Sequence, residues 1–224
     1  MSEIMRPKFI TFDCYGTLTN FQMATMTREL FAERIPEPAR MERFIRDFSA
    51  YRFDEVLGPW KPYVEVVKGA LERTCKRWGI DYIDADGQRY YDAVPTWGPH
   101  PDVIEGLSKI AGKIPLVIYS NACDDQIMSN VAKLEVPFHK VFTADTFKVY
   151  KPRLTAFEAM IDTLGCNPED LLHVSSSFRY DLMSAHFMGI KDKAFVARSH
   201  EPYAPGYGAT EIADIRGLPA LVGL

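Results

Sequence analysis

An aspartate directly follows a short apolar segment near the N-terminus. Residues 9–12, Phe-Ile-Thr-Phe, are typical of a buried strand, and Asp13 comes next, with Gly16 permitting a sharp turn just beyond it. In an open α/β sheet, ligands bind beyond the carboxyl ends of the strands, which is where this aspartate would lie. A carboxylate in that place can act as a nucleophile in covalent catalysis. It can also do no more than cap the following helix.

Three later segments carry polar or charged residues in corresponding places, after apolar residues. Their key residues are Ser120 with Asn121, then Lys151, then Asp181. If the preceding strands are neighbours in a parallel sheet, these side chains meet Asp13 at one edge of that sheet. Taken singly, each has a structural alternative: a turn, a solvated cation, or an acidic residue in the first turn of a helix.

In this order, the four segments resemble the motifs of the haloacid dehalogenase superfamily, and in particular those of its (S)-2-haloacid dehalogenases. They are Asp-x-Tyr-Gly-Thr-Leu at 13–18, Ser-Asn at 120–121, Tyr-Lys-Pro at 150–152 and Ser-Ser-Ser-Phe-Arg-Tyr-Asp at 175–181. The resemblance spans nearly the whole chain. It implies a Rossmann-like core with an inserted helical cap.

The resemblance assigns catalytic roles to four residues. It implies that Asp13 is the nucleophile and forms an aspartyl ester, that Thr17 supports its oxygens, and that Asp181 orients the water that later attacks the ester. It also implies that Lys151 keeps Asp13 ionised. A cation about 4 Å away, at an effective dielectric constant near 20, contributes roughly 4 kcal/mol of attraction before desolvation costs, which offsets a pKa raised by burial.

A second group of residues is expected to contact the substrate. The resemblance implies that Ser120 holds the substrate carboxylate and that Asn121 helps to bind the departing halide, and hydrogen-bond donors suit both anions. Backbone amides near Cys14 and Tyr15 are expected to stabilise the oxyanion formed when the ester is hydrolysed. The fourth segment supplies the remaining predicted substrate-binding residues, Ser175, Ser177 and Phe178.

The cap is expected to add one cation. Arg46 resembles, by its place in the second cap helix, the arginine that contacts halide and substrate in this family. Arg43 and Arg52 are alternatives, and an ordinary solvated arginine is another.

The chain departs from the family pattern at two places. The fourth segment is one residue longer than expected, with Ser177 where the dehalogenases carry asparagine. Phe157 stands six residues after the motif lysine, where family members often carry tyrosine, so one hydroxyl is missing from the expected pocket.

These residues predict hydrolytic dehalogenation of small 2-haloalkanoic acids to 2-hydroxy acids, without a cofactor or metal. The main alternative is a phosphatase of the same superfamily, whose second aspartate protonates the leaving alcohol. Tyr15 occupies that position here, and Asp181 has no adjacent acid to help hold Mg²⁺. Two further alternatives are a hydrolase of another small 2-substituted acid and a binding relative without catalysis.

Helical and strand patterns divide the chain into two domains. Apolar residues repeat at helical spacing within 19–98, and no strand is needed there. From residue 99 onwards apolar strands alternate with helices, which favours a parallel sheet covered on both faces. We therefore predict an α/β protein with a Rossmann-like, doubly wound core at 1–18 and 99–224, and an all-helical cap at 19–98.

Composition limits the partners and the compartment. The chain has 224 residues with a net charge of −4, so it lacks the basic surface of a nucleic-acid-binding protein. Its four widely spaced cysteines suggest free thiols in a reducing compartment. Residues 1–8 do not resemble a signal peptide, and no apolar run suggests a membrane span. We expect a cytoplasmic protein with a small-molecule substrate, and a homodimer is compatible with these features.

Overall fold

The computed structural model describes residues 4–224. The first three residues of segment 1–8, which was predicted not to be a signal peptide, lie outside the described part. The chain forms two compact units. One comprises the N-terminal segment up to Asn20 together with Gly98–Leu224, and the other comprises Phe21–Trp97. The chain thus divides after residues 20 and 97, whereas the prediction divided it after residues 18 and 98.

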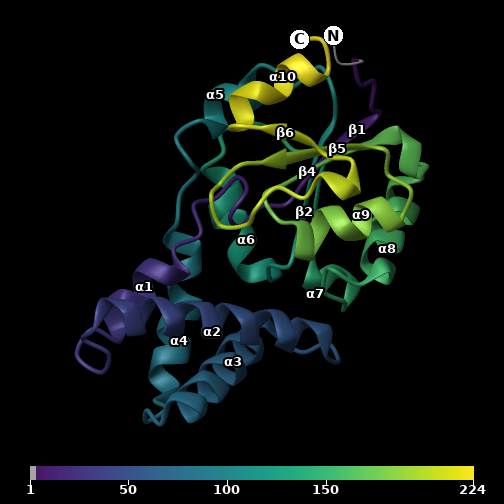
Figure 1. The fold of residues 1–224 in the computed structure, drawn as a ribbon. Coiled ribbons are helices and arrows are strands. Elements are labelled where there is room, and N and C mark those ends of the chain that lie inside the picture. Colours follow the sequence, from purple (N-terminus) through teal and green to yellow (C-terminus); the bar gives the residue numbers. More distant parts are fainter. Residues whose placement is uncertain (1–3) are drawn as a thin grey trace. The chain divides into compact units, whose positions relative to one another are not determined.

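The first unit is built on a six-stranded sheet in which every pairing is parallel, as predicted (Figure 1). Its strands lie in the order β3-β2-β1-β4-β5-β6. They are β1 (Phe9–Phe12), β2 (Leu116–Ser120), β3 (Lys140–Thr143), β4 (Leu171–Ser175), β5 (Asp192–Val196) and β6 (Thr210–Ile212). This is the order of a doubly wound nucleotide-binding fold, which confirms the predicted class.

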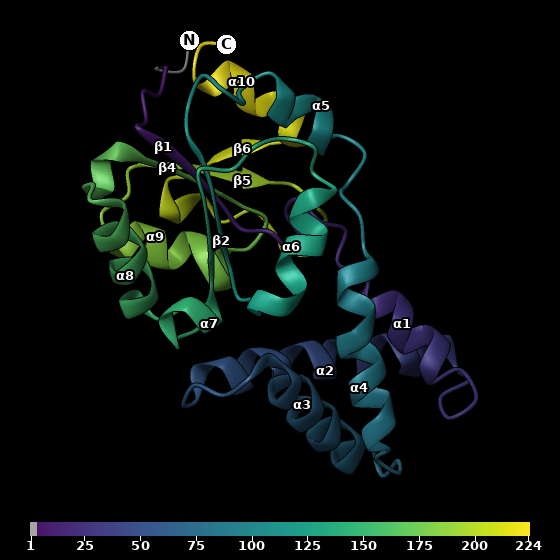
Figure 2. The ribbon, with the colours of Figure 1, turned by 180° about the vertical axis from the view of Figure 1, so that it is seen from behind.

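Helices cover both faces of this sheet (Figure 2). They are α5 (Val103–Ser108), α6 (Asp124–Ala132) and α10 (Leu218–Leu221) on one face, and α8 (Leu154–Leu164) and α9 (Met183–Phe187) on the other. Side chains alternate between the two faces along each strand. In β2, for example, Ile118 packs on the first face and Val117 and Tyr119 on the second. The remaining helical segments of this unit are α7 (Ala144–Phe147) and short turns at Pro168–Asp170, Pro205–Tyr207 and Ile215–Gly217.

The position of β1 in the sheet decides where a site can form. β1 pairs with β2 on one side and with β4 on the other. The chain adds β2 and β3 on one side of β1 and then crosses back to add β4, β5 and β6 on the other. In register, Phe12 lies beside Ile118 and beside Val174, so the three strands end at nearly the same level. A reversal of strand order of this kind opens a crevice at the carboxyl ends of the strands.

A π-helical turn, Phe178–Leu182, follows β4 and leads into α9. The backbone N–H of Leu182 donates to the carbonyl oxygen of Ser177, and that of Met183 donates to Phe178, so each bond spans five residues. A π turn holds one residue more than an α turn and is frequent at functional sites. It therefore accommodates the extra residue predicted for the fourth segment and carries Asp181.

The regular secondary structure of the second unit is helical, and none of its residues 21–97 lies in a strand. Its helices are α1 (Met23–Leu30), α2 (Pro38–Leu57), α3 (Tyr63–Trp78) and α4 (Asp84–Ala93), followed by a short turn at Val94–Thr96. Pro38 lies in the first turn of α2, where its missing N–H costs nothing, and Gly79 ends α3 with φ +65°. Phe44 packs on Phe31 and Trp78 at the centre of this unit. Among the described helices, none is both long and apolar enough to cross a membrane.

Candidate active site

Asp13 lies one residue beyond β1, with 8% of its surface exposed. Its backbone N–H donates to the carbonyl oxygen of Val174 at 3.0 Å, which continues the pairing with β4. The chain then turns at Gly16, whose φ of +94° strains any other residue. This turn brings the Thr17 hydroxyl back to donate to Oδ2 of Asp13 at 2.7 Å. The nucleophile predicted from sequence is thus buried and held at one oxygen.

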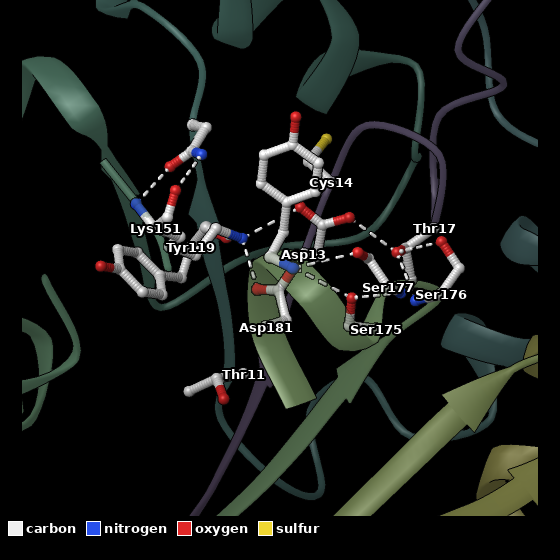
Figure 3. A network of polar contacts seen from close by, with 12 residues as sticks. Thr11, Asp13, Cys14, Thr17, Tyr119, Lys151, Ser175, Ser176, Ser177 and Asp181 are labelled. Carbon is white, nitrogen blue, oxygen red and sulfur yellow. Dashed lines mark hydrogen bonds and ion pairs between the residues drawn. The ribbon is translucent and has the colours of Figure 1, made fainter. Parts of the chain in front are cut away.

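The ammonium group of Lys151 lies between the two predicted catalytic carboxylates (Figure 3). Nζ donates to Oδ1 of Asp13 at 3.0 Å, to Oδ1 of Asp181 at 2.6 Å and to the carbonyl oxygen of Tyr119 at 2.8 Å. These three bonds use all three of its hydrogens. Lys151 is 1% exposed, so the ion pairs are shielded from water.

Asp181 is fully buried and accepts hydrogen bonds at both oxygens. Oδ1 lies 2.6 Å from Lys151 Nζ and 3.2 Å from Nε2 of His173. Oδ2 accepts from the hydroxyl of Ser175 at 3.1 Å. The structure therefore brings together Asp13, Thr17, Lys151 and Asp181, which come from three separate segments of the chain.

The electrostatics of the two carboxylates differ. Burial raises the pKa of Asp13, Lys151 lowers it and nearby Asp181 raises it, and the net direction is upward. Burial also raises the pKa of Asp181, but Lys151 and His173 together lower that pKa by more than burial raises it, so the net direction is downward. For Lys151, burial lowers the pKa and the two carboxylates raise it by more. A single ammonium group is thus shared, and Asp181 is the better stabilised anion of the two.

Ser120 and Asn121 lie at the carboxyl end of β2, next to β1. The Ser120 hydroxyl is buried and has no hydrogen-bond partner among residues 4–224. Asn121 instead binds the main chain of Lys151: its Nδ2 donates to the carbonyl oxygen, and its Oδ1 accepts from the N–H, both at 2.8 Å. One amide hydrogen of Asn121 stays available for a ligand.

The fourth segment divides into residues that face the carboxylates and residues that face away. Ser175 donates to Asp181 and accepts from the N–H of Ser177. The Ser177 hydroxyl, by contrast, donates to Glu201 at 2.8 Å and caps the π-helical turn. Phe178 packs in a hydrophobic cluster with Phe195, Leu182 and Ala209. Contact of Ser177 and Phe178 with substrate stays a prediction.

Cys14 and Tyr15 follow Asp13 in the chain. Cys14 is fully buried, and burial raises its pKa to about 12, so its thiol stays neutral and is not a nucleophile. The Tyr15 hydroxyl donates to Oδ1 of Asn130 on α6 at 2.9 Å. Tyr15 therefore occupies the position where the phosphatases of this superfamily carry their second aspartate, and it supplies no carboxylate there.

The candidate arginines all belong to the second unit. Arg43 and Arg46 are exposed on α2 and line an open hollow of about 520 Å³. Its other lining residues are Arg40, Asp47, Arg77 and Trp78. The Arg52 guanidinium stacks over Phe48 at 5.0 Å from the ring centre, and its Nε is buried without a hydrogen-bond partner in the described residues. The arginine that meets the substrate stays a prediction.

The donor set near Asp13 suits an ammonium group better than a divalent cation. Lys151 already occupies one oxygen of each carboxylate, and a second cation there would be repelled. Within residues 4–224, no group of three or more His, Cys, Asp or Glu is arranged to hold a metal ion.

Sequence reasoning missed several polar residues that complete the network. His173 and Thr11 lie inside apolar strands, and a polar residue within such a segment was the available signal. The Ser176 hydroxyl lies 3.0 Å from that of Thr17 and 3.0 Å from Nε2 of His200. Since His200 lies far along the chain in a loop, only the fold brings it to the turn that follows Asp13.

Known proteins resemble this chain in sequence and in fold. A family model described as haloacid dehalogenase-like hydrolase matches residues 7–189. An (S)-2-haloacid dehalogenase from Xanthobacter autotrophicus is 26% identical over 220 residues, covering 96% of this chain and 85% of the relative. Another, (S)-2-haloacid dehalogenase H-109 from Pseudomonas putida, is 24% identical and covers 93% of each chain.

A solved structure shares the fold over nearly the full length. It is an L-2-haloacid dehalogenase from Xanthobacter autotrophicus with chloropropionic acid covalently bound, and it superposes with a TM-score of 0.76 at 21% identity, covering 96% of this chain and 98% of that one. The match of the family model over most of the chain is decisive for classification. The chain belongs to the haloacid dehalogenase-like hydrolase family.

Proposed function

We propose that the protein hydrolyses the carbon–halogen bond of small 2-haloalkanoic acids and releases 2-hydroxy acids. The observation that carries this proposal is the setting of Asp13, which is buried and oriented by Lys151 and Thr17. Tyr15 stands two positions later, in place of an acid. A departing halide needs no proton, whereas an alcohol that leaves a phosphate ester is protonated by a general acid.

In the first step, a carboxylate oxygen of Asp13 attacks carbon 2 of the acid from the side opposite the halogen. The new carbon–oxygen bond forms as the carbon–halogen bond breaks, and the halide leaves with the bonding electrons. The product is an aspartyl ester with inverted configuration at carbon 2. Lys151 and Thr17 orient the attacking carboxylate, and such positioning is a large part of catalysis.

In the second step, water attacks the ester carbonyl carbon of Asp13. Its proton passes to Asp181, and the tetrahedral intermediate collapses by breaking the acyl–oxygen bond. The departing alkoxide takes up the proton and becomes the 2-hydroxy acid. The oxygen of the water and its second hydrogen stay on Asp13, whose carboxyl group then releases that proton to solvent. The low pKa of Asp181 favours the ionised carboxylate that accepts this proton.

The buried hydroxyl of Ser120 is the strongest candidate for binding the substrate carboxylate. A hydroxyl buried without a hydrogen-bond partner costs about 1–3 kcal/mol, and a ligand oxygen that accepts from it relieves this cost. The free amide hydrogen of Asn121, at the same strand end, is suited to the halide. A second-unit arginine, Arg46, Arg43 or Arg52, would add the positive charge that two anions in one site require.

The decisive experiment is an assay of halide release from (S)- and (R)-2-halo acids, with and without EDTA. We expect halide and an inverted 2-hydroxy acid in equal amounts, with activity that survives EDTA. Single turnover in H₂¹⁸O should place the label on Asp13 before it reaches the product. Label that enters the hydroxy acid directly would contradict the ester mechanism.

The same assay separates the alternatives. Mg²⁺-dependent release of phosphate from p-nitrophenyl phosphate, without halide release, would favour a phosphatase. Binding of a 2-substituted acid without turnover would favour a binding relative.

The compartment and the assembly are further proposals. Cys14, Cys75, Cys123 and Cys166 are thiols rather than disulfide halves, which suits a reducing compartment, and we propose the cytoplasm. Cell fractionation tests the location. Light scattering of the purified protein tests the predicted homodimer.

A further inference from the structure

Two polar residues, Thr11 and His173, lie side by side in the central strands of the sheet. They are register partners in β1 and β4, so both side chains point to the same face. Both are fully buried. Oγ1 of Thr11 lies 2.8 Å from Nδ1 of His173, and Nε2 of the same ring lies 3.2 Å from Oδ1 of Asp181. The three residues form a polar chain that reaches the site from within the core.

The acceptor at one end decides which ring nitrogen carries hydrogen. An ionised carboxylate only accepts hydrogen bonds, so Nε2 of His173 must donate to Asp181. In a neutral ring Nδ1 is then an acceptor, and the Thr11 hydroxyl donates to it. Thr11 thus selects the tautomer that points a hydrogen at Asp181, as the outer partner of a functional histidine usually does.

The bonds to Asp181 leave its two oxygens unequal. Oδ1 accepts from both Lys151 and His173, whereas Oδ2 accepts from Ser175 alone among residues 4–224. A carboxylate oxygen accepts about two hydrogen bonds, so Oδ2 keeps capacity for a water molecule. Phe157 packs edge to face against the His173 ring, with the ring centres 5.4 Å apart, and restrains its orientation.

We propose that His173, oriented by Thr11, is a positioning residue for the second chemical step. It holds Oδ1 of Asp181 so that Oδ2 takes the proton from the water that attacks the Asp13 ester. Lys151 serves the first step through Asp13, and His173 serves the second through Asp181. This inference rests on the function proposed above.

The test compares the two steps in the double variant Thr11→Val/His173→Phe, which removes both polar partners and leaves no orphaned hydroxyl. We expect kcat to fall about 10- to 100-fold, the usual loss when a partner that orients a functional ligand is removed. We expect kcat/KM to stay within about twofold, because it reports only the steps up to ester formation. Halide should appear in a burst equal to the enzyme, and mass spectrometry should find the ester on the peptide that contains Asp13.

Two single variants serve as matched controls. His173→Gln offers an amide hydrogen toward Asp181 and should recover part of kcat. Thr11→Val leaves the ring in place without its orienting donor and should give a smaller loss with the same signature. A merely structural role would lower kcat and kcat/KM together and would not accumulate ester.

Equal falls in kcat and kcat/KM, or an unchanged kcat, would overturn the role of His173. If the double variant does not fold, ¹⁵N NMR of the unmodified protein decides, because hydrogen on Nδ1 rather than on Nε2 overturns it as well. A wild-type protein that releases no halide overturns the proposed function and this role together. A wild-type protein that turns over beside a variant with depressed kcat/KM overturns the role of His173 alone.

Discussion

Asn121 holds the main chain of Lys151 at both of its polar atoms, with an N–O distance of 2.8 Å at each. The two residues are 30 positions apart in the chain. The clamp joins the end of β2 to the loop that carries the ammonium group. Asn121 therefore fixes the backbone of Lys151, and from this fixed backbone the Lys151 side chain reaches both Asp13 and Asp181.

Replacing Asn121 with aspartate tests this clamp. The carboxylate still accepts from the N–H of Lys151 but cannot donate to its carbonyl oxygen, so the loop shifts. We expect kcat/KM to fall about 10- to 100-fold, since a displacement of about 1 Å at a catalytic group costs up to 100-fold. Steady-state halide release measures this, and circular dichroism checks the fold. An unchanged kcat/KM would show that the clamp does not position Lys151.

The charge of Lys151 is tested by its replacement with methionine, which keeps the length of the side chain. Two adjacent buried carboxylates would then lack their shared cation, so we expect ester formation to slow by orders of magnitude. Lys151→Arg should recover only part of the rate, because a guanidinium differs in shape and reach. Rapid-quench measurement of the ester provides the comparison. A methionine variant with the wild-type rate would place the essential cation elsewhere.

The raised pKa of Asp13 predicts the acid limb of the pH profile. As pH falls through this pKa, the nucleophile takes up a proton and kcat/KM drops about tenfold per pH unit. The limb should therefore lie above 3.8, the ordinary value for aspartate. Thr17→Val removes a hydrogen bond that lowers this pKa, so the limb should move to higher pH still. A limb at or below 3.8 in the wild type would contradict this electrostatic account.

Asp13→Asn should abolish turnover and at the same time change stability with pH. Because the folded pKa of Asp13 lies above the unfolded value, its contribution to stability is full below the unfolded pKa and is lost as pH rises through the folded one. Each unit of difference is worth about 1.4 kcal/mol. The variant should thus unfold at higher urea concentration than wild type at pH 7, and lose this advantage toward pH 4. A variant that is less stable at pH 7 would show that the Lys151–Asp13 pair outweighs the burial of charge.

Tyr15→Asp tests the choice between leaving groups. The variant adds a third carboxylate near Asp13 and Asp181, and we expect halide release to fall at least tenfold through repulsion of the anionic substrate. Tyr15→Phe is the control, since it keeps the ring and removes the hydroxyl that binds Asn130, a bond worth about 1 kcal/mol. Faster halide release by the aspartate variant would contradict the argument.

Much of the fold could be predicted because its signals are local. The apolar residues of β1, β2 and β4 are each followed by a turn and a polar side chain, so strand ends and candidate site residues are visible together. β6 was not predicted, because three residues with one buried side chain carry no clear period. The π-helical turn also escaped, although the extra residue that it accommodates was noticed.

The sequence by itself determined which residues are the candidates for the chemistry: Asp13, Lys151 and Asp181 each stand in a motif defined by near neighbours in the chain. Only the tertiary structure decided how their charges are shared. Lys151 binds both carboxylates, Asn121 is turned to the lysine loop, and His173 and Thr11 support Asp181 from inside the core. The physical reason is the difference between separation along the chain and distance in space. Motifs and periodicity depend on residues close in sequence, whereas the pKa of a buried group depends on every charge and dipole within a few ångströms, and the fold draws those from distant parts of the chain.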